Sequence, residues 1–229
     1  MGIVGLTLRF VWILVLYFQM HMHISAVKSL ALRVKPSIIN KKPGDSYRVF
    51  PNLLMTEIQI DGPLQCIVSD MTAFYVKGIY YELTLYMDLW NNEIVSHSLS
   101  SKRGDRMTYI SDLEDLIALK KQYPEYEMIL HSDQGSVYTS KAFNDLLPMY
   151  SITHSMSRAG TPTDNAAMEA INGWIKAEMF IDFHVTGERP VVDEVKEYIH
   201  FFNEQRPAYS LNYLTPTQYR KLHYERISD

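Results

Sequence analysis

Strand and helix signals follow one another in a definite order after Leu64, and that order constrains the fold of the chain. The first three signals are strand-like, because they are apolar runs rich in aromatic and β-branched residues or alternate apolar with polar positions. Asn91 and Asn92 separate the second run from the third, as expected for a turn between antiparallel strands. We predict strands at 65–70, 80–87, 94–99, 127–131 and 151–154, and helices at 105–122, 140–149, 164–181, 190–204 and 215–225. This order predicts an α/β fold with a mixed five-stranded sheet, antiparallel in its first three strands and flanked by helices.

The segments before this sheet differ from it in composition. Residues 1–24 are strongly apolar, and residues 25–63 combine a short basic helix, predicted at 25–34, with a proline-rich linker. We therefore expect an atypical apolar N-terminus at 1–24, a basic helix and linker at 25–63, and a core with C-terminal helices at 64–229. An apolar run this short favours a packing helix or an atypical start of the reading frame, and a membrane segment or signal peptide is the alternative.

Charge is distributed unevenly along the 229 residues, whose net charge is −4. Residues 1–48 contain seven basic residues and one acidic residue, so the rest of the chain is acidic. A protein that binds DNA usually carries a basic patch, and only the segment from Lys28 to Arg48 qualifies as one in the sequence. The single cysteine, Cys66, has apolar neighbours, which is typical of a small buried side chain, and we expect a cytoplasmic protein.

Three acidic residues occupy positions at the edges of the predicted elements. Asp70 ends the first strand, Asp133 follows the fourth strand, and Glu169 lies on the third predicted helix. Because strand ends and an adjoining helix converge at one edge of an open sheet, we expect the three carboxylates to approach one another. Carboxylates are hard oxygen ligands that suit Mg²⁺ or Mn²⁺, and two such ions stabilise the attacking and leaving oxygens of a phosphodiester. The pattern therefore predicts a two-metal site for phosphodiester chemistry.

Each carboxylate alone has an ordinary structural explanation. Asp70 at a strand end and Asp133 in an Asp-Gln-Gly sequence can both shape turns, and Glu169 can face solvent on its helix. Asp88 is interpreted as structural, and His131 is not required as a ligand, because the carboxylates already suit a divalent cation. The prediction of a metal site thus depends on the combination of the three residues.

Short motifs around these residues resemble those of a known family. They lie at 69–72 (Ser-Asp-Met-Thr), 86–90 (Tyr-Met-Asp-Leu-Trp), 131–135 (His-Ser-Asp-Gln-Gly), 155–160 (Ser-Met-Ser-Arg-Ala-Gly), 164–166 (Asp-Asn-Ala) and 202–207 (Phe-Asn-Glu-Gln-Arg-Pro). Asp133 and Glu169 have 35 residues between them, and Lys176 follows Glu169 by seven positions. In these features residues 48–225 resemble the catalytic frame of bacterial insertion-sequence transposases of the two-reading-frame group, relatives of retroviral integrases. The resemblance does not extend to residues 1–24.

The resemblance implies a ribonuclease H-like fold and a polynucleotidyl transferase, the catalytic subunit of a DNA transposase. Asp70, Asp133 and Glu169 would be its catalytic residues and would hold two Mg²⁺ or Mn²⁺ ions. Such an enzyme cleaves phosphodiesters at transposon ends with water and then joins the freed 3′-hydroxyl to target DNA. Its implied partners are DNA, an upstream-frame helix-turn-helix protein or fusion, and further copies of itself in a synaptic complex. The alternatives are a ribonuclease H-like nuclease that only hydrolyses, and a truncated or inactive DNA-binding remnant.

Four residues of the predicted helix that carries Glu169 share one face, because their spacing is 4, 3 and 4: Asn165, Glu169, Asn172 and Lys176. We predict that Lys176 holds a DNA phosphate beside the metals, with Asn165 and Asn172 as further DNA contacts. Arg158, in the preceding loop, is also a predicted phosphate contact. The alternative for Lys176 is an ion pair with an acidic neighbour.

Overall fold

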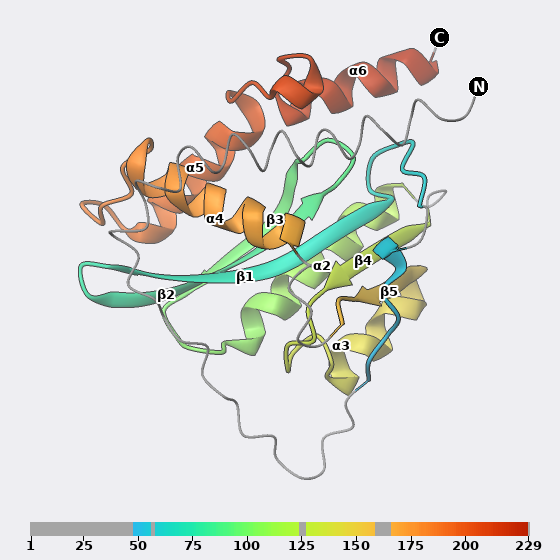
Figure 1. Ribbon diagram of the computed structural model, residues 1–229, viewed down its shortest axis with the longest axis horizontal. Helices are drawn as coiled ribbons and strands as arrows, with labels where there is room; N and C mark the ends of the chain where they lie inside the picture. Colours follow the sequence, from blue (N-terminus) through green and yellow to red (C-terminus); the bar gives the residue numbers. More distant parts are fainter. Residues whose placement is uncertain (1–47, 56–57, 124–126, 159–165, 229) are drawn as a thin grey trace.

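A mixed five-stranded sheet is the centre of the structure, a computed structural model that describes residues 48–55, 58–123, 127–158 and 166–228 (Figure 1). The strands are β1 (Cys66–Val76), β2 (Ile79–Asp88), β3 (Ile94–Ser100), β4 (Met128–Ser132) and β5 (Ile152–Met156). Their order across the sheet is β3-β2-β1-β4-β5. Pairing is antiparallel for β1–β2 and β2–β3, and parallel for β1–β4 and β4–β5. The prediction of a mixed sheet that is antiparallel in its first three strands is confirmed.

Helices cover both faces of this sheet. Among the described residues the α-helices are α2 (Arg106–Gln122), α3 (Lys141–Leu146), α4 (Ala166–Ile181), α5 (Val191–Glu204) and α6 (Pro216–Ser228). Figure 1 shows α4 and α5 on one side of the sheet and α2 and α3 on the other. Within the described ranges, no helix combines the length and the hydropathy that crossing a bilayer requires. The helix predicted at 25–34 and the apolar residues 1–24 lie outside the described residues.

Two hydrophobic cores form because successive side chains of a strand point to opposite faces of a sheet. Val68 of β1 belongs to the core that includes Ile175 of α4 and Tyr198 of α5. The adjacent Ile67 belongs to the other core, together with Leu113 of α2. The sheet is thus buried on both sides, and α4 is fixed against the face to which Val68 points.

Strand β1 is longer than the predicted strand at 65–70. It continues to Val76 and pairs with β2 along that length, ending at Val76 opposite Ile79. The connecting residues Lys77 and Gly78 have positive φ angles of 49° and 78°, the backbone conformation of a tight two-residue hairpin turn. The extension carries β1 well beyond the end of its parallel neighbour β4, and leaves its second half paired on one side only by β2.

The helix predicted at 140–149 is divided into two parts. Ser140 caps α3 as predicted, because its hydroxyl accepts a hydrogen bond from the Phe143 N–H at 3.4 Å. The α-helix ends at Leu146, and a 3₁₀ turn over Leu147–Tyr150 follows. Pro148 accounts for this change, because proline has no N–H to donate to the carbonyl four residues earlier.

The segment after α5 is held against α4 by Arg206. The Arg206 Nε donates to Glu178 Oε1 at 2.6 Å, and the Tyr198 hydroxyl donates to Glu178 Oε2 at 2.9 Å. The Arg206 guanidinium also covers the Trp174 ring, with its carbon 3.9 Å from the ring centroid. Because Trp174 and Glu178 both belong to α4, one arginine fixes the last turns of α4 relative to the C-terminal segment.

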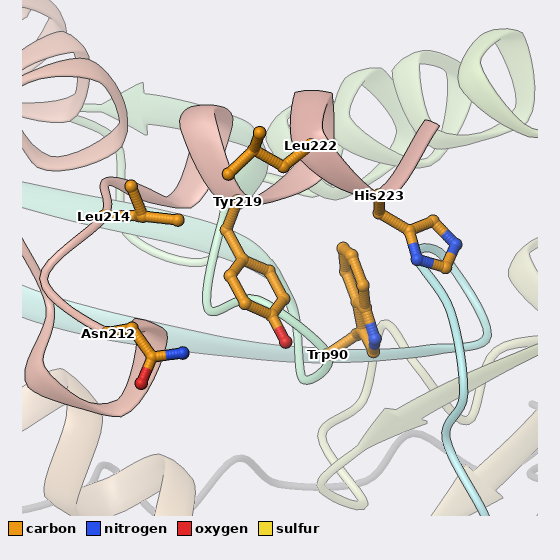
Figure 2. Close-up of a pocket in the computed structure, with 6 residues that line it drawn as sticks. All are labelled: Trp90, Asn212, Leu214, Tyr219, Leu222 and His223. Atoms are coloured by element: carbon orange, nitrogen blue, oxygen red, sulfur yellow. The ribbon is translucent and has the colours of Figure 1, made fainter. Parts of the chain in front are cut away.

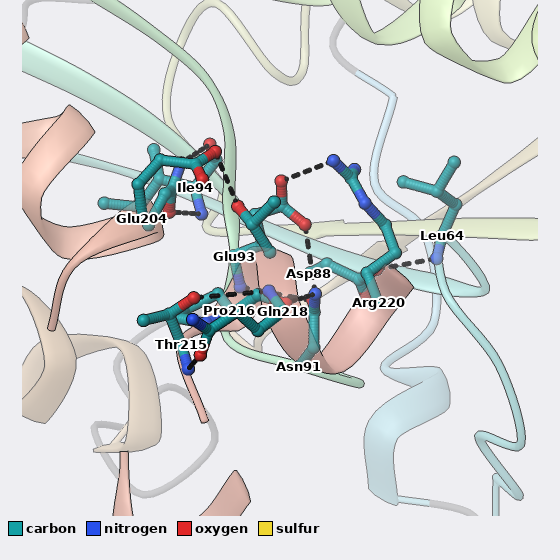
Figure 3. Close-up of polar contacts among 12 residues, drawn as sticks. Leu64, Asp88, Asn91, Glu93, Ile94, Glu204, Thr215, Pro216, Gln218 and Arg220 are labelled. Atoms are coloured by element: carbon teal, nitrogen blue, oxygen red, sulfur yellow. Dashed lines mark hydrogen bonds and ion pairs between the residues drawn. The ribbon is translucent and has the colours of Figure 1, made fainter. Parts of the chain in front are cut away.

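Helix α6 is attached to the turn between β2 and β3 by polar contacts (Figure 3). Arg220 forms an ion pair with Glu93 at 2.9 Å, and the Asn91 amide donates to the Pro216 carbonyl at 3.0 Å. Thr215 and Gln218 form a reciprocal capping pair at the start of α6, with distances of 3.0 and 3.2 Å. Through these contacts α6 covers the edge of the sheet at which β1 and β4 begin.

Candidate active site

Asp70 and Asp133 lie next to each other at one edge of the sheet. The parallel pairing of β1 with β4 ends at Val68 opposite His131. Two residues further along the same register, Asp70 stands beside Asp133, which is the first residue after β4. Asp70 is on the face that α4 covers, since Asn172 of α4 bonds its carboxylate. The structure therefore places two of the three predicted carboxylates at the same edge of the sheet.

The Asp133 carboxylate is half-buried and is fixed by the loop that follows β4. Its Oδ1 accepts the Gly135 N–H at 2.8 Å, and Oδ2 accepts no hydrogen bond from the described residues. Burial raises the pKa of Asp133, and the Gly135 bond offsets part of that rise. A Cβ atom at Gly135 would lie 2.8 Å from Oδ1, so a larger residue there would displace the carboxylate. Glycine at 135 is thus required by the position of Asp133.

The Asp70 carboxylate is oriented from α4. The Asn172 amide donates to Asp70 Oδ2 at 2.7 Å, and the Met71 N–H lies 2.8 Å from Oδ1. Asn172 is buried, 6% exposed, and its own Oδ1 has no hydrogen-bond partner among the described residues. This pair joins β1 to α4 at the position where the carboxylates meet.

Glu169 lies on α4 and is placed through its helical backbone. It precedes Asn172 by three residues, which in an α-helix is the same face and a rise of about 4.5 Å. Since Asn172 contacts Asp70 directly, the backbone of Glu169 is about one turn from that contact. The backbone of α4 therefore passes Asp70, and the part of Glu169 in the site stays a prediction.

Buried polar side chains support the strand ends beneath the carboxylates. Ser132 Oγ donates to the Asp133 carbonyl at 2.9 Å and lies 3.0 Å from His154 Nε2. His154 Nδ1 lies 2.5 Å from Asn144 Oδ1, so both ring nitrogens are occupied within the protein. Burial, with a smaller effect of His131, lowers the pKa of His154 to about 4. His154 is therefore neutral near pH 7 and connects β4, β5 and α3.

The predicted DNA contacts differ in how the structure places them. Lys176 is half-buried one turn after Asn172, and burial lowers the pKa of its amine. In the described part of the chain no carboxylate lies within ion-pair distance of Lys176, and its contact with DNA stays a prediction. Arg158 is exposed, two residues after β5 and at the same edge of the sheet as Asp133. Asn165 lies outside the described residues.

The donor set fits a hard divalent cation. Two carboxylates lie at an open sheet edge, and the Asp133 carboxylate has a raised pKa and an oxygen that accepts no hydrogen bond from the described residues. Over the described ranges the side chains form no complete cluster of three metal-ligating residues. The third ligand would come from Glu169, so the predicted triad stays a prediction.

Asp88 is structural, as predicted. Its Oδ2 accepts the Leu64 N–H at 2.7 Å, and its Oδ1 accepts the Trp90 N–H at 2.9 Å. The dashed line from Leu64 in Figure 3 marks the first of these bonds. Burial raises the pKa of Asp88 to about 6. Asp88 pairs with Ile67 near the start of β1 and is therefore remote from the edge where Asp133 lies.

A small pocket lies on that remote edge, under α6 (Figure 2). It has a volume of about 120 Å³ and is lined by Trp90, Asn212, Leu214, Tyr219, Leu222 and His223. The Trp90 ring contacts the rings of Tyr219 and His223, at centroid distances of 4.9 and 4.7 Å. A water molecule occupies roughly 30 Å³, so this volume admits a few waters and is too small for a nucleotide. The pocket is separate from the carboxylate site.

Two functional features were not evident from the sequence. The contact of Asn172 with Asp70 crosses 102 positions of the chain, and the helical spacing identified only its shared face with Glu169. The Ser69 hydroxyl, 2.5 Å from the buried Tyr138 hydroxyl, fixes β1 to the loop after Asp133. No local sequence signal indicates either partner.

Comparisons with known proteins agree with this geometry. A family model described as "Integrase core domain" matches residues 61–162, and a second model with the same description matches residues 150–216. The chain is 30% identical over 201 residues to the transposase for insertion sequence element IS904 of Lactococcus lactis, an alignment that covers 87% of this chain and 78% of the relative. The chain belongs to the insertion-sequence transposases that carry an integrase core. This transposase is also 34% identical over 196 residues to InsK of insertion sequence element IS150 of Escherichia coli (strain K12), covering 86% of this chain and 68% of the relative.

Solved structures support the same fold for the transposase. The HTLV-2 integrase catalytic core domain in complex with magnesium has a TM-score of 0.56 at 19% identity, over 71% of this chain and 99% of that chain. The catalytic core domain of BIV integrase has a TM-score of 0.53 at 12% identity, over 72% and 99%. The predicted ribonuclease H-like fold of the integrase type is confirmed, and the transposase belongs to the polynucleotidyl transferases, as the resemblance implied.

Proposed function

We propose that this chain cleaves DNA at transposon ends and transfers the freed 3′-hydroxyl to target DNA, with Asp70, Asp133 and Glu169 holding two Mg²⁺ or Mn²⁺ ions. The observation that carries the proposal is the contact of Asn172 with Asp70 at the register position of Asp133. This contact supports the proposal because it joins the helix of Glu169 to the strand of Asp70. When bound, the metals would activate the attacking oxygen and neutralise charge on the leaving oxygen.

The side chains of this site have separate roles in the proposed reaction. Asp70 is held by Asn172 from α4, and Asp133 is held by the Gly135 N–H, so neither carboxylate has to reorganise before it binds an ion. Lys176 has no carboxylate partner in the described part of the chain and is available to a phosphate of the bound DNA. Arg158 is exposed at the same edge and would contact the backbone further along.

Both proposed steps are displacements at phosphorus in which no bond to the protein forms. Positioning of the phosphodiester and neutralisation of its charge then supply most of the rate enhancement. An asparagine at Asp133 would keep the shape and the Gly135 bond while removing the negative charge. We therefore expect Asp133→Asn to abolish cleavage and joining, and to leave the fold unchanged.

A strand-transfer assay tests this proposal. A labelled duplex that joins the terminal sequence of the element to flanking DNA is incubated with plasmid DNA and Mg²⁺ or Mn²⁺. Joined products from the wild type, none from Asp133→Asn, and full activity of Asp182→Asn are expected, because Asp182 is an exposed aspartate just after α4. Cut products without joining would identify a hydrolytic nuclease, and no reaction would identify an inactive remnant. Full activity of Asp133→Asn would contradict the site itself.

Partners belong to the same proposal. We propose that an upstream-frame helix-turn-helix protein or fusion recognises the terminal repeats, and that copies of the chain assemble when two DNA ends are paired. The chain alone is then expected to bind DNA weakly and without sequence preference. A gel shift that showed tight binding of the chain only to terminal repeats would contradict this expectation.

A further inference from the structure

A basic loop connects β3 to α2 and is prominent on the surface. Lys102 and Arg103 lie in the loop, Arg106 begins α2, and all three are exposed. In the sequence only the segment from Lys28 to Arg48 stands out as basic, and these three cations are followed by acidic residues of α2. The structure separates the three cations from those acids by placing them on the loop and the first helical turn.

Hydrogen bonds from β2 and from within the loop hold the loop in one conformation. Glu82 of β2 is buried, 3% exposed, and its Oε2 accepts the Gly104 N–H at 2.7 Å. The Ser100 hydroxyl accepts the Lys102 N–H at 3.1 Å and donates to Asp105 Oδ2 at 2.8 Å. A loop fixed in this way presents its cations without a large loss of conformational entropy on binding.

The acidic groups of the loop are used by these internal bonds. Asp105 caps α2 by accepting the Met107 N–H at 3.1 Å, in addition to its bond from Ser100. In contrast, Lys102, Arg103 and Arg106 form no ion pair within the described part of the chain. Their charge therefore remains available to an anionic partner.

Aromatic side chains adjoin the cations. The Arg103 guanidinium carbon lies 4.3 Å from the centroid of the Tyr80 ring. Tyr75, 49% exposed, packs against Tyr80 with centroids 5.4 Å apart. An arginine stacked on a ring keeps its outer N–H groups directed away from the protein, which suits contact with phosphate oxygens.

The loop lies at the same edge of the sheet as the carboxylates. β3 runs in the direction of β1, so its end is at the edge where Asp133 follows β4. Tyr109, one turn after Arg106, is buried, and the charges of Glu82, Asp133 and Asp70 add to the effect of burial in raising its pKa. The first turn of α2 therefore lies near the carboxylates, and the basic loop opens onto the same edge of the sheet.

We propose that Lys102, Arg103 and Arg106 bind the phosphate backbone of duplex DNA next to the phosphodiester that Asp70 and Asp133 engage. The proposal rests on the proposed function, and adds a second contact surface to Lys176. Along each strand of a duplex the phosphates are spaced by about 3.4 Å along the axis. When one phosphodiester lies at the carboxylates, phosphates further along the duplex therefore lie over the basic loop. Contacts to phosphates carry no sequence information, so the loop binds any duplex.

The salt dependence of DNA binding tests this inference. Fluorescence anisotropy of a labelled 30-base-pair duplex, in EDTA, is recorded at several NaCl concentrations for the full chain and for Lys102→Gln/Arg106→Gln. Each lost phosphate contact lowers the slope of log K against log salt by about 0.9, so we expect a slope that is smaller by about 2. The loss should be equal for duplexes of unrelated sequence.

A matched control changes two exposed lysines elsewhere. Lys121, at the other end of α2, and Lys221, on α6, are both exposed, and Lys121→Gln/Lys221→Gln alters the net charge by the same amount. A slope that is unchanged in the loop variant, or reduced equally in the control, overturns the inference. Arg106→Gln alone, with an expected decrease of about 1, replaces the double variant if that protein does not fold.

The result is independent of catalysis. Binding is measured without divalent cations, so a wild type that binds through the loop but neither cuts nor joins DNA would contradict the proposed function and leave this inference intact. Conversely, joining by the wild type together with an unchanged slope in the loop variant would contradict this inference alone.

Discussion

Asn172 shows how one side chain determines the position of a carboxylate in another element. It is buried on α4, and its amide reaches Asp70 on β1 at 2.7 Å. Without that donor, Asp70 Oδ2 would lose a hydrogen bond that fixes its direction. If Asp70 holds a metal ion as proposed, a partner that orients it in this way affects metal affinity without touching the metal.

Replacing Asn172 should therefore weaken metal binding more than it weakens the fold. We expect Asn172→Ala to reduce the affinity for Mn²⁺ by about 10–100-fold, as is usual for residues that orient metal ligands. Isothermal titration calorimetry of the purified chain with MnCl₂ measures this. Asn203→Ala is the control, since Asn203 bonds both the N–H and the carbonyl of Ile94 away from the site. Equal Mn²⁺ affinities for the wild type and Asn172→Ala would refute the orienting role.

For single residues, the sequence predicts which side chains belong to the site better than it predicts the contacts they make. Asp70 and Asp133 are recognisable because strand patterns end at or just before them, and the register of β1 with β4 then brings them together. The bond from Asn172 and the need for glycine at 135 depend on tertiary distances of 2.7 and 2.8 Å. Periodicity gives the face of a helix, and it does not say which strand that face meets.

The packing of α2 on the sheet contains a buried carboxylate. Asp112 is 0% exposed, and its Oδ1 accepts hydroxyl protons from Ser96 and Ser98 at 3.0 and 2.7 Å. Its Oδ2 and the buried Tyr86 hydroxyl have no hydrogen-bond partner among the described residues. Burial raises the pKa of Asp112 to about 7, so the charged form is unfavourable between α2 and β3.

Stability should fall as this carboxylate ionises. The unfolded chain releases the Asp112 proton near pH 4 and the folded chain near pH 7, so the favourable contribution is complete below about pH 4 and is lost as pH rises to 7. Relative to the wild type, Asp112→Asn should gain up to roughly 1.4 kcal/mol of unfolding free energy per pH unit in that window. Urea denaturation at pH 4 to 8 measures the difference. Glu114→Gln, at an exposed carboxylate two residues further along α2, should show no such trend. A difference between Asp112→Asn and the wild type that does not change with pH would contradict the assignment.

The limits of a helix or strand are predicted well where the local pattern of apolar residues is clear. The strands that became β2, β3 and β5, and helices α2 and α5, lie within about two residues of their predicted limits because their apolar patterns are uninterrupted. β1 is longer than predicted because Asp70 interrupts its apolar pattern, and its second half depends on pairing with β2 across the Lys77-Gly78 turn. The helix predicted at 140–149 is longer than the observed α3 because Pro148 lacks the N–H that would continue the α-helical hydrogen bonds.

For the whole molecule, Cys66 offers a probe of global unfolding. It is the single cysteine, is 0% exposed in the central strand, and its pKa is raised to about 12 by burial and the charge of Asp88. We expect its labelling by a disulfide reagent to be slower in the native protein than in urea by at least about a thousandfold, because the strand must separate from β2 and β4 first. As the urea concentration rises, the labelling rate should increase over the same range in which circular dichroism reports unfolding. Rapid labelling of protein with native circular dichroism would show that β1 opens independently.

The contact of Arg206 with α4 has a consequence for where this chain can be divided. A fragment that stopped after α4 would leave the Glu178 carboxylate without its guanidinium and uncover one face of the Trp174 indole. The last turns of the helix that carries Glu169 would then keep their packing on β1 through Phe180, and lose their contacts with α5 and Arg206. Expression boundaries for biochemical work should accordingly include α5 and the residues through Arg206, even where only the carboxylate chemistry is of interest.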